Sequence, residues 1–176
     1  MKLQMLSAAA ASLILTVVFT ILRCCLSGGV WFSLAITSGT TAYHIIYRIA
    51  VGTCVSSMCK SPNPQSLWFR QKSFEPVLYR FLRVMRWKRY MPTYEPNDFD
   101  HTLHTWDEII QTMCRSELVH EIDIPLSFLP LLCVRIFGAF PAFMITSAGA
   151  AAFDLLFVII QRFNRPRVIK LKNRRL

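Results

Sequence analysis

Acidic residues are scarce in this sequence, and long stretches of it carry no charge at all. The 176 residues include 10 Asp and Glu against 20 Lys and Arg, and 53% are hydrophobic. A soluble domain would spread its charges along the chain, whereas here basic blocks alternate with apolar runs. Such segregation is more typical of membrane orientation and anionic headgroup contact than of nucleic-acid binding. The composition therefore predicts an integral membrane protein with no nucleic-acid partner.

Familiar cysteine and serine motifs are also missing. None of the six cysteines forms a Cys-x-x-Cys pair, so we expect neither a zinc site nor a disulfide framework. Most of them lie in or beside apolar segments, where cysteine packs as a small hydrophobe. Without a Gly-x-Ser-x-Gly elbow, direct group transfer is simpler than an acyl-enzyme route. Cys114, one turn before Glu117, is the one residue that we keep as a candidate nucleophile.

Two apolar stretches in the first third of the chain predict membrane-spanning helices. Residues 3–22 are twenty uncharged positions, enough to cross roughly 30 Å of hydrocarbon. This run is longer than the apolar region of a signal peptide, so we expect a retained span. The second stretch, 29–55, is interrupted only by His44 and Arg48. Its many small residues favour close helix packing in lipid.

Two further stretches lie near the C-terminus. Residues 118–137 contain Pro125 and Pro130, so this segment crosses the bilayer only if neighbouring helices shield it. Residues 141–160 hold a single charge, Asp154, and a short link makes the last two stretches a helical hairpin. We therefore predict an all-α membrane domain over residues 1–176, with about four transmembrane helices.

The distribution of basic residues predicts the orientation. Lys and Arg concentrate in the segment 56–117 and in the tail 161–176, whereas the other two connections carry only Arg23 and Arg135. Basic loops stay on the cytoplasmic side. We expect a multi-pass protein of the cell membrane with both termini and the middle segment in the cytoplasm.

The cytoplasmic segment predicts two helices. In the first, Ser73 is the expected N-cap and Pro76 lies near the start, and apolar residues recur at helical spacing from Val77 to Met85. Such a basic amphipathic helix lies either in the membrane interface or against the protein's own cytoplasmic face. Thr105 and Glu108 form a capping box that starts the second helix, which continues towards the third stretch.

The loop between these helices holds acidic and imidazole side chains, but their spacing matches no strong ligand pattern. We therefore expect no metal there or elsewhere in the chain. The residues concerned are Glu95, Asp98, Asp100, His101 and His104.

Glu117 and His120 are one turn apart on the second predicted helix, where it enters the bilayer. A carboxylate beside an imidazole can orient it and stabilise the imidazolium, as a general base requires. The alternative is an interfacial ion pair that anchors the helix end. We predict that His120 and Glu117 are catalytic.

Ionisable residues inside the predicted spans cost free energy unless they face the bundle and find partners. His44 and Arg48 lie one turn apart on the second stretch, and Asp154 lies near the cytoplasmic end of the fourth. We expect Arg48 to pair with Asp154, and we expect all three residues to bind substrate or donor. A purely structural pair is the alternative.

Three ordered motifs resemble one family of small integral membrane enzymes. They are Trp87-Lys88 followed by Pro92, then Arg115-x-Glu117-Leu118-Val119-His120, then Gln161-Arg162-Phe163-Asn164-Arg165-Pro166-Arg167. Over about residues 65–170 they resemble the glycosyl-4,4'-diaponeurosporenoate acyltransferase family of staphyloxanthin-type carotenoid biosynthesis. Phe163 stands where the family pattern has Tyr.

The resemblance implies transfer of a fatty acyl group to a sugar hydroxyl of a glycosylated carotenoid or other membrane glycolipid. Acyl-CoA or another activated donor would be the co-substrate, without a further cofactor. Arg115, Arg162, Asn164 and Arg165 would join the residues that bind substrate or donor, and Arg162 and Arg165 would hold donor phosphates. A lipid methyltransferase and a non-catalytic membrane scaffold are the alternatives.

Overall fold

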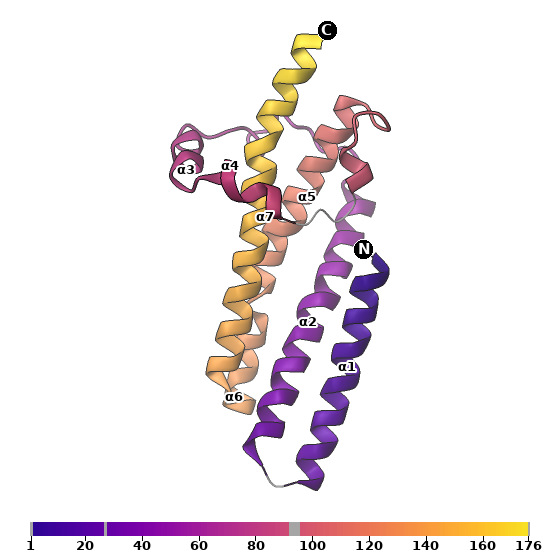
Figure 1. The fold of residues 1–176 in the computed structure, drawn as a ribbon, viewed down its shortest axis with the longest axis vertical. Coiled ribbons are helices and arrows are strands. Elements are labelled where there is room, and N and C mark those ends of the chain that lie inside the picture. The colour runs from indigo at the N-terminus through magenta and orange to yellow at the C-terminus, as the bar shows by residue number, and fades with distance from the viewer. Residues whose placement is uncertain (1, 27, 92–95, 176) are drawn as a thin grey trace. The chain divides into compact units, whose positions relative to one another are not determined.

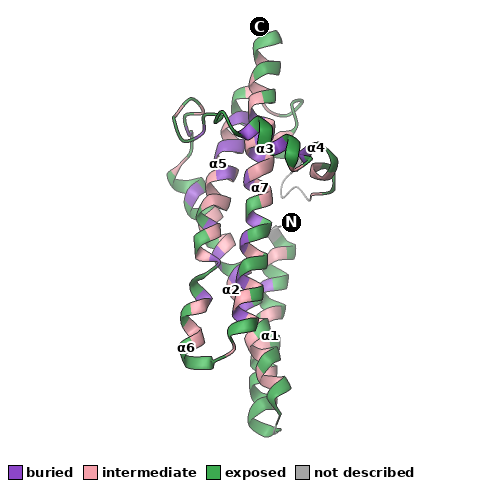
Figure 2. Ribbon diagram, turned by 90° about the vertical axis from the view of Figure 1, so that its left-hand side faces the viewer, coloured by how far each residue is buried: buried purple, intermediate pink, exposed green. Residues whose placement is uncertain are grey.

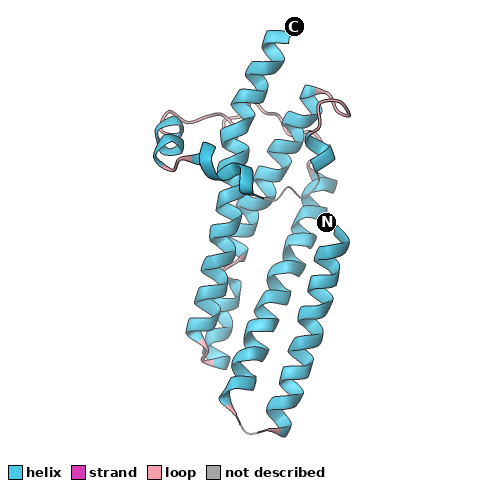
Figure 3. Cartoon of the chain, in the orientation of Figure 1, coloured by secondary structure: helices cyan, strands magenta, loops and turns pink. Residues whose placement is uncertain are grey.

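The computed structural model describes residues 2–26, 28–91 and 96–175, and every regular element in these ranges is a helix (Figures 1 and 3). The all-α class is thereby confirmed. Pro92 and Glu95, which belong to sequence patterns discussed above, lie outside the described residues. The α-helices are α1 (Lys2–Cys25), α2 (Gly29–Met58), α3 (Glu75–Phe81), α4 (Val84–Trp87), α5 (Trp106–Leu126), α6 (Val134–Phe137) and α7 (Phe140–Arg175). The 3-10 helices are η1 (Lys88–Tyr90), η2 (Pro96–Phe99) and η3 (Leu129–Cys133).

The chain divides into two compact units. The first comprises Met1–Thr53 and Ile122–Asp154, and the second comprises Cys54–Glu121 and Leu155–Leu176. The expected single membrane domain stays a prediction.

In the first unit, α1 and α2 lie side by side (Figure 1). Thr16 donates a hydrogen bond of 3.1 Å to Ser38 across the pair. A Cβ atom on Gly39 would lie 3.4 Å from the methyl group of Thr16, at ordinary van der Waals distance, so Gly39 lies on the face of α2 that packs against α1. The small residues of α2 therefore serve helix packing, as their composition predicts.

Apolar side chains of α1 are largely exposed, and Figure 2 shows little buried surface along it. Among the described residues, two helical stretches are long and apolar enough to cross a membrane, Leu3–Cys25 and Phe140–Arg174. The expected count of four transmembrane helices is not confirmed.

The segment 118–137 is not one helix. The helix α5 ends at Leu126, and the chain then forms η3 and α6 before Gly138, whose φ of 73° ends α6 in the left-handed region that favours glycine. Pro130 lies in the first turn of η3, where its missing N–H costs no helical hydrogen bond. The prolines thus interrupt the third apolar stretch.

Two tyrosines of α2 satisfy carbonyl groups at the end of α5. The hydroxyl of Tyr43 donates to the carbonyl of Leu126 at 2.9 Å, and that of Tyr47 donates to the carbonyl of Asp123 at 3.3 Å. Ser127, which is fully buried, lies 2.7 Å from the Tyr47 hydroxyl. Helix ends leave carbonyls without intrahelical partners, so these bonds stabilise the interruption within the first unit.

In the second unit the helix predicted to start at Ser73 differs from its prediction. Ser73 is not the N-cap, because α3 begins at Glu75 after Phe74, which makes no side-chain capping bond. Pro76 does lie in the first turn, as expected. The predicted helix also breaks at Arg83, which adopts a left-handed conformation with φ of 51° between α3 and α4.

The helix predicted to start at Thr105 is confirmed. The backbone N–H of Thr105 donates to the Glu108 carboxylate at 2.8 Å, and the Glu108 N–H donates to the Thr105 hydroxyl at 3.3 Å. This capping box precedes α5, which runs without interruption past Glu117 and His120.

The basic tail is helical, because α7 continues to Arg175. Lys172 near its end pairs with Asp107 on α5 at 2.6 Å. Tertiary pairing of this kind favours a longer helix than the apolar run alone indicates.

Candidate functional site

The most buried charges of the second unit meet at Glu117. Its carboxylate, on α5, is fully buried and accepts a hydrogen bond of 2.7 Å from Arg162 on α7. Arg165, one turn further along α7 and only 2% exposed, donates to the other carboxylate oxygen. Burial raises the pKa of Glu117, and the two guanidinium groups oppose that rise. We call Glu117, Arg162 and Arg165 the arginine–glutamate network.

The remaining donors of the network hold the loop before α3. Arg162 pairs with buried Glu75 at 2.7 Å, and Arg165 donates to the carbonyl of Phe69 and lies over its ring. The guanidinium groups that we expected to hold donor phosphates are thus bound to carboxylates and backbone carbonyls. Sequence reasoning missed Glu75 as a partner, although a carboxylate beside apolar residues at a helix start was a signal.

His120 occupies a separate position on α5. Its imidazole stacks on the ring of Phe157 from α7, with ring centroids 4.6 Å apart and an angle of 14° between the planes. Both carboxylate oxygens of Glu117 bind arginines instead of this imidazole. The structure therefore orients the His120 ring by aromatic stacking, which differs from the expected orientation by Glu117.

The other predicted residues of this unit have local partners. Lys88 donates a hydrogen bond of 2.9 Å to the side-chain carbonyl of Asn164 and lies 4.9 Å from the centre of the Phe163 ring. Arg115 donates to Thr112 of its own helix at 2.9 Å. Asn164 therefore ties α7 to the segment after α4, whereas Arg115 stays within α5.

The first unit brings Arg48 and Asp154 together, as the sequence predicts. The guanidinium of Arg48 lies 2.5 Å from the buried carboxylate of Asp154 and also donates to the carbonyl of Ala150 at 3.2 Å. His44 is buried one turn before Arg48, against Tyr43 and Tyr47.

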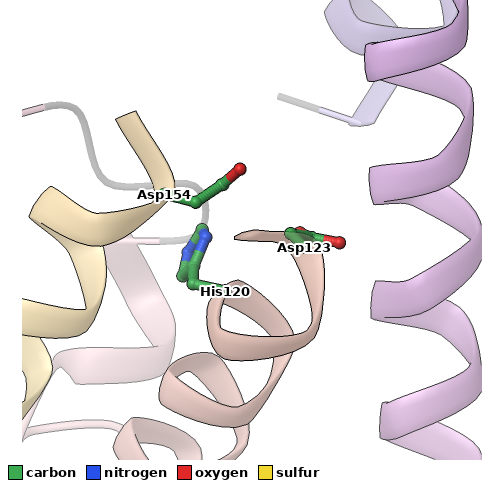
Figure 4. A group of neighbouring side chains, drawn as sticks. All are labelled: His120, Asp123 and Asp154. Carbon is green, nitrogen blue, oxygen red and sulfur yellow. The ribbon is translucent and has the colours of Figure 1, made fainter. Parts of the chain in front are cut away.

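Asp123 is the residue of this unit that sequence reasoning missed. It is 1% exposed, and neither carboxylate oxygen has a hydrogen-bond partner among the described residues. One of its oxygens lies within 4.8 Å of an Asp154 oxygen. Figure 4 shows Asp154 on α7 and Asp123 near the end of α5, with His120 one turn earlier on the same helix. The signal in the sequence that could have identified Asp123 was an acidic residue between two apolar runs.

Buried polar groups without partners are rare in proteins and often mark binding sites. Both imidazole nitrogens of His44 and the hydroxyl of Ser147 share this condition with Asp123. We call His44, Asp123 and Ser147 the unsatisfied polar residues of the first unit.

A family model decides the identity. The model for glycosyl-4,4'-diaponeurosporenoate acyltransferase matches residues 64–174, which is more than half of the chain. The chain belongs to this family. It is therefore an enzyme with acyltransferase activity, and the family's place is in carotenoid biosynthesis. No curated protein and no solved structure shows significant similarity to it.

The match includes the arginine–glutamate network, His120, Asn164, Arg115 and Asp154, whereas His44 and Arg48 precede it. It also decides between the candidate activities, because it supports an acyltransferase over a methyltransferase or a non-catalytic scaffold.

Cys114, which the sequence leaves open as a nucleophile, has a side chain that is fully buried on α5. Burial raises the pKa of its thiol to about 11. Because the thiolate is the reactive form of cysteine, this environment disfavours a nucleophilic role.

The loop before α5 uses its polar groups in local turns. The carboxylate of Asp100 accepts hydrogen bonds from the backbone and hydroxyl of Thr102 at 2.8 and 2.7 Å. His101 packs against Trp106, and His104 lies 3.7 Å from Glu108. These contacts account for the turn and for the start of α5.

Proposed function

We propose that this acyltransferase moves a fatty acyl group onto a sugar hydroxyl of a glycosylated carotenoid, or of a related membrane glycolipid, at the cytoplasmic interface. The family match carries the proposal. The unsatisfied polar residues of the first unit support it, because sugar hydroxyls both donate and accept hydrogen bonds and so suit imidazole, carboxylate and hydroxyl groups without partners. Arg48 and Asp154 would support these side chains from the neighbouring ion pair.

His120 is the proposed general base. Its half-buried imidazole stacks on Phe157, and an imidazole can both accept and return a proton. The imidazole takes the proton of the sugar hydroxyl as the oxygen attacks the acyl carbonyl. With a thioester donor the new C–O bond replaces the C–S bond, and the imidazolium returns its proton to the departing thiolate.

The arginine–glutamate network is a positioning element in this scheme. Charge-assisted bonds from Arg162 and Arg165 join α7 to Glu117, three residues before His120. Movement of α5 against α7 would displace the imidazole, and small misplacements of a catalytic group reduce rates strongly. Arg115 and Asn164 would contribute to donor or acceptor binding through the same two helices.

The proposed topology has four membrane passes with both termini in the cytoplasm. The exposed apolar surface of α1, the apolar half of α7 and the small-residue packing of α2 support three of them. The interrupted segment 118–137 would be the fourth, because irregular backbone is tolerated in a membrane where protein groups satisfy its carbonyls. Basic residues in the second unit and the tail set the orientation.

The outward face of α3 suits the membrane interface. Phe74, just before the helix, and Val77 and Phe81 on it are 62%, 68% and 80% exposed. Large exposed apolar side chains on a short helix suit the boundary between headgroups and acyl chains. This favours the interfacial interpretation of the helix over packing against the protein itself.

His120→Ala in reconstituted membranes tests the function. A labelled acyl donor and a glycosylated carotenoid acceptor are supplied, and acylated product is measured by mass spectrometry. A general base contributes about a hundredfold or more, so the rate should fall by at least that factor. His101→Ala removes an exposed imidazole outside the proposed site and should leave the rate unchanged. Wild-type activity in a folded His120→Ala protein would overturn the proposal.

A further inference from the structure

A cleft of about 440 Å³ opens in the second unit between the α3–α4 segment and α7. Tyr79, Val84 and Phe163 line it, and each is no more than 6% exposed. The rings of Tyr79 and Phe163 meet edge to face with centroids 5.5 Å apart. These buried side chains give the cleft a firm apolar floor.

The rest of the lining is strongly basic. Arg80, Arg83 and Arg86 come from the α3–α4 segment and Arg167 comes from α7, and none of the described lining residues is acidic. Arg80, Arg83 and Arg86 are exposed and form no ion pair with a described carboxylate. Arg162 and Arg165 differ from these three residues, because carboxylates neutralise their charges.

Arg167 and Lys88 show that the positive charge is held in place. Arg167 donates to the carbonyl of Phe163 and its guanidinium lies 3.5 Å from the centre of that ring. Burial and then the charge of Arg167 lower the pKa of nearby Lys88. Arg167 thus adds a fixed positive charge to the lining of the cleft.

The backbone at the rim is strained. Arg83 is the only non-glycine residue with positive φ among the described residues, a conformation that is unfavourable for an L-residue. Strain of this kind persists where the surrounding structure enforces it, and it concentrates at binding sites. Arg83 lies between Arg80 and Arg86 in the sequence, and all three line the cleft.

We propose that this cleft, which we call the arginine cleft, binds the phosphate groups of the acyl donor. Guanidinium groups bind phosphate oxygens through paired N–H donors, and several of them suit a donor with more than one phosphate, such as a coenzyme A thioester. The proposal rests on the acyltransferase function above and changes the expected donor residues from Arg162 and Arg165 to the arginines of the cleft.

Calorimetric titration of the purified full chain in detergent tests this assignment. The probes are coenzyme A, dephospho-coenzyme A and pantetheine, which carry progressively fewer phosphates. We expect affinity to fall in that order and to weaken at high salt. Arg80→Gln and Arg86→Gln should each weaken coenzyme A binding by about five- to tenfold, and the double variant by more.

Arg89→Gln is the matched control, because Arg89 is an exposed arginine one turn beyond Arg86 and does not line the cleft. It should bind coenzyme A like the wild type. Melting curves establish that each variant is folded. Equal affinity for coenzyme A and pantetheine, or an equal effect of the control and cleft variants, would overturn the proposal.

Anionic lipid headgroups are the other source of phosphate. Flotation with phosphatidylglycerol and phosphatidylcholine vesicles separates the two, because a donor site should leave vesicle binding unchanged in the double variant. Arginine-dependent preference for phosphatidylglycerol without coenzyme A binding would overturn the donor assignment. Acyl transfer is measured on the same variants: transfer that persists without arginine-dependent donor binding refutes only the cleft, whereas donor binding without any transfer refutes only the proposed function.

Discussion

Arg165 and Glu117 form an ion pair in which neither side chain is more than 2% exposed. Two charges removed from water this completely depend on each other, because either one alone would be an uncompensated buried charge. Arg162 joins the same carboxylate from the next turn of α7. In the second unit, the packing of α5 on α7 therefore depends on the Glu117 carboxylate.

Glu117→Gln should destabilise the protein severely. It leaves the Arg165 guanidinium buried without a counter-charge, a change that typically costs about 3–5 kcal/mol. Thermal unfolding in detergent, followed by circular dichroism, measures the loss. Asp107→Asn removes the exposed carboxylate that pairs with Lys172 and should have only a small effect. Similar melting temperatures for the two variants would contradict the network's structural role.

Arg48 and Asp154 should be energetically coupled. Arg48→Leu removes the cation that pairs with the buried Asp154 carboxylate and should destabilise strongly, whereas Arg48→Leu with Asp154→Leu removes both charges. A double-mutant cycle on unfolding free energy should give a coupling of about 0.5–3 kcal/mol. Strict additivity of the two single changes would show that the pair contributes no interaction.

Tyr43→Phe should weaken the interruption that follows α5. The change removes the hydroxyl that satisfies the Leu126 carbonyl and leaves the ring in place. A loss of about 1 kcal/mol is expected for one hydrogen bond. Tyr90→Phe removes an exposed hydroxyl bonded only to its neighbour Arg89, and serves as the control. Denaturant unfolding that places both variants at the wild-type midpoint would refute the stabilising role of Tyr43.

Cys114→Ala should retain acyl transfer. The buried thiol has its pKa raised to about 11, so its protonated form dominates at every pH well below that value. Alkylation of Cys114 in the native protein should therefore be negligible at pH 8 and increase as the pH approaches 11. Mass spectrometry of the alkylated peptide follows this. Loss of transfer in a folded Cys114→Ala protein would restore Cys114 as a candidate nucleophile.

The predictions made from local sequence patterns were the most reliable ones. The capping box of Thr105 and Glu108 was predictable because both partners lie within one helical turn. The prediction of Ser73 as the N-cap was wrong, because neighbouring residues compete for that position and Phe74 directly precedes the helix. The extent of α7 was underestimated, because its basic end is stabilised by acids distant in the chain.

The sequence by itself determined the helical class, the segregation of basic from apolar segments and the pairing of Arg48 with Asp154. Two opposite charges inside apolar runs have few possible partners, so that pair follows from free energy alone. Only the tertiary structure decided which arginines are neutralised and which are not. Arg162 and Arg165 are saturated by Glu75 and Glu117, whereas Arg80 and Arg86 face a cleft without acids. Which arginines are neutralised depends on distances between segments that are far apart in the chain, and the spacing of residues in the sequence does not give those distances.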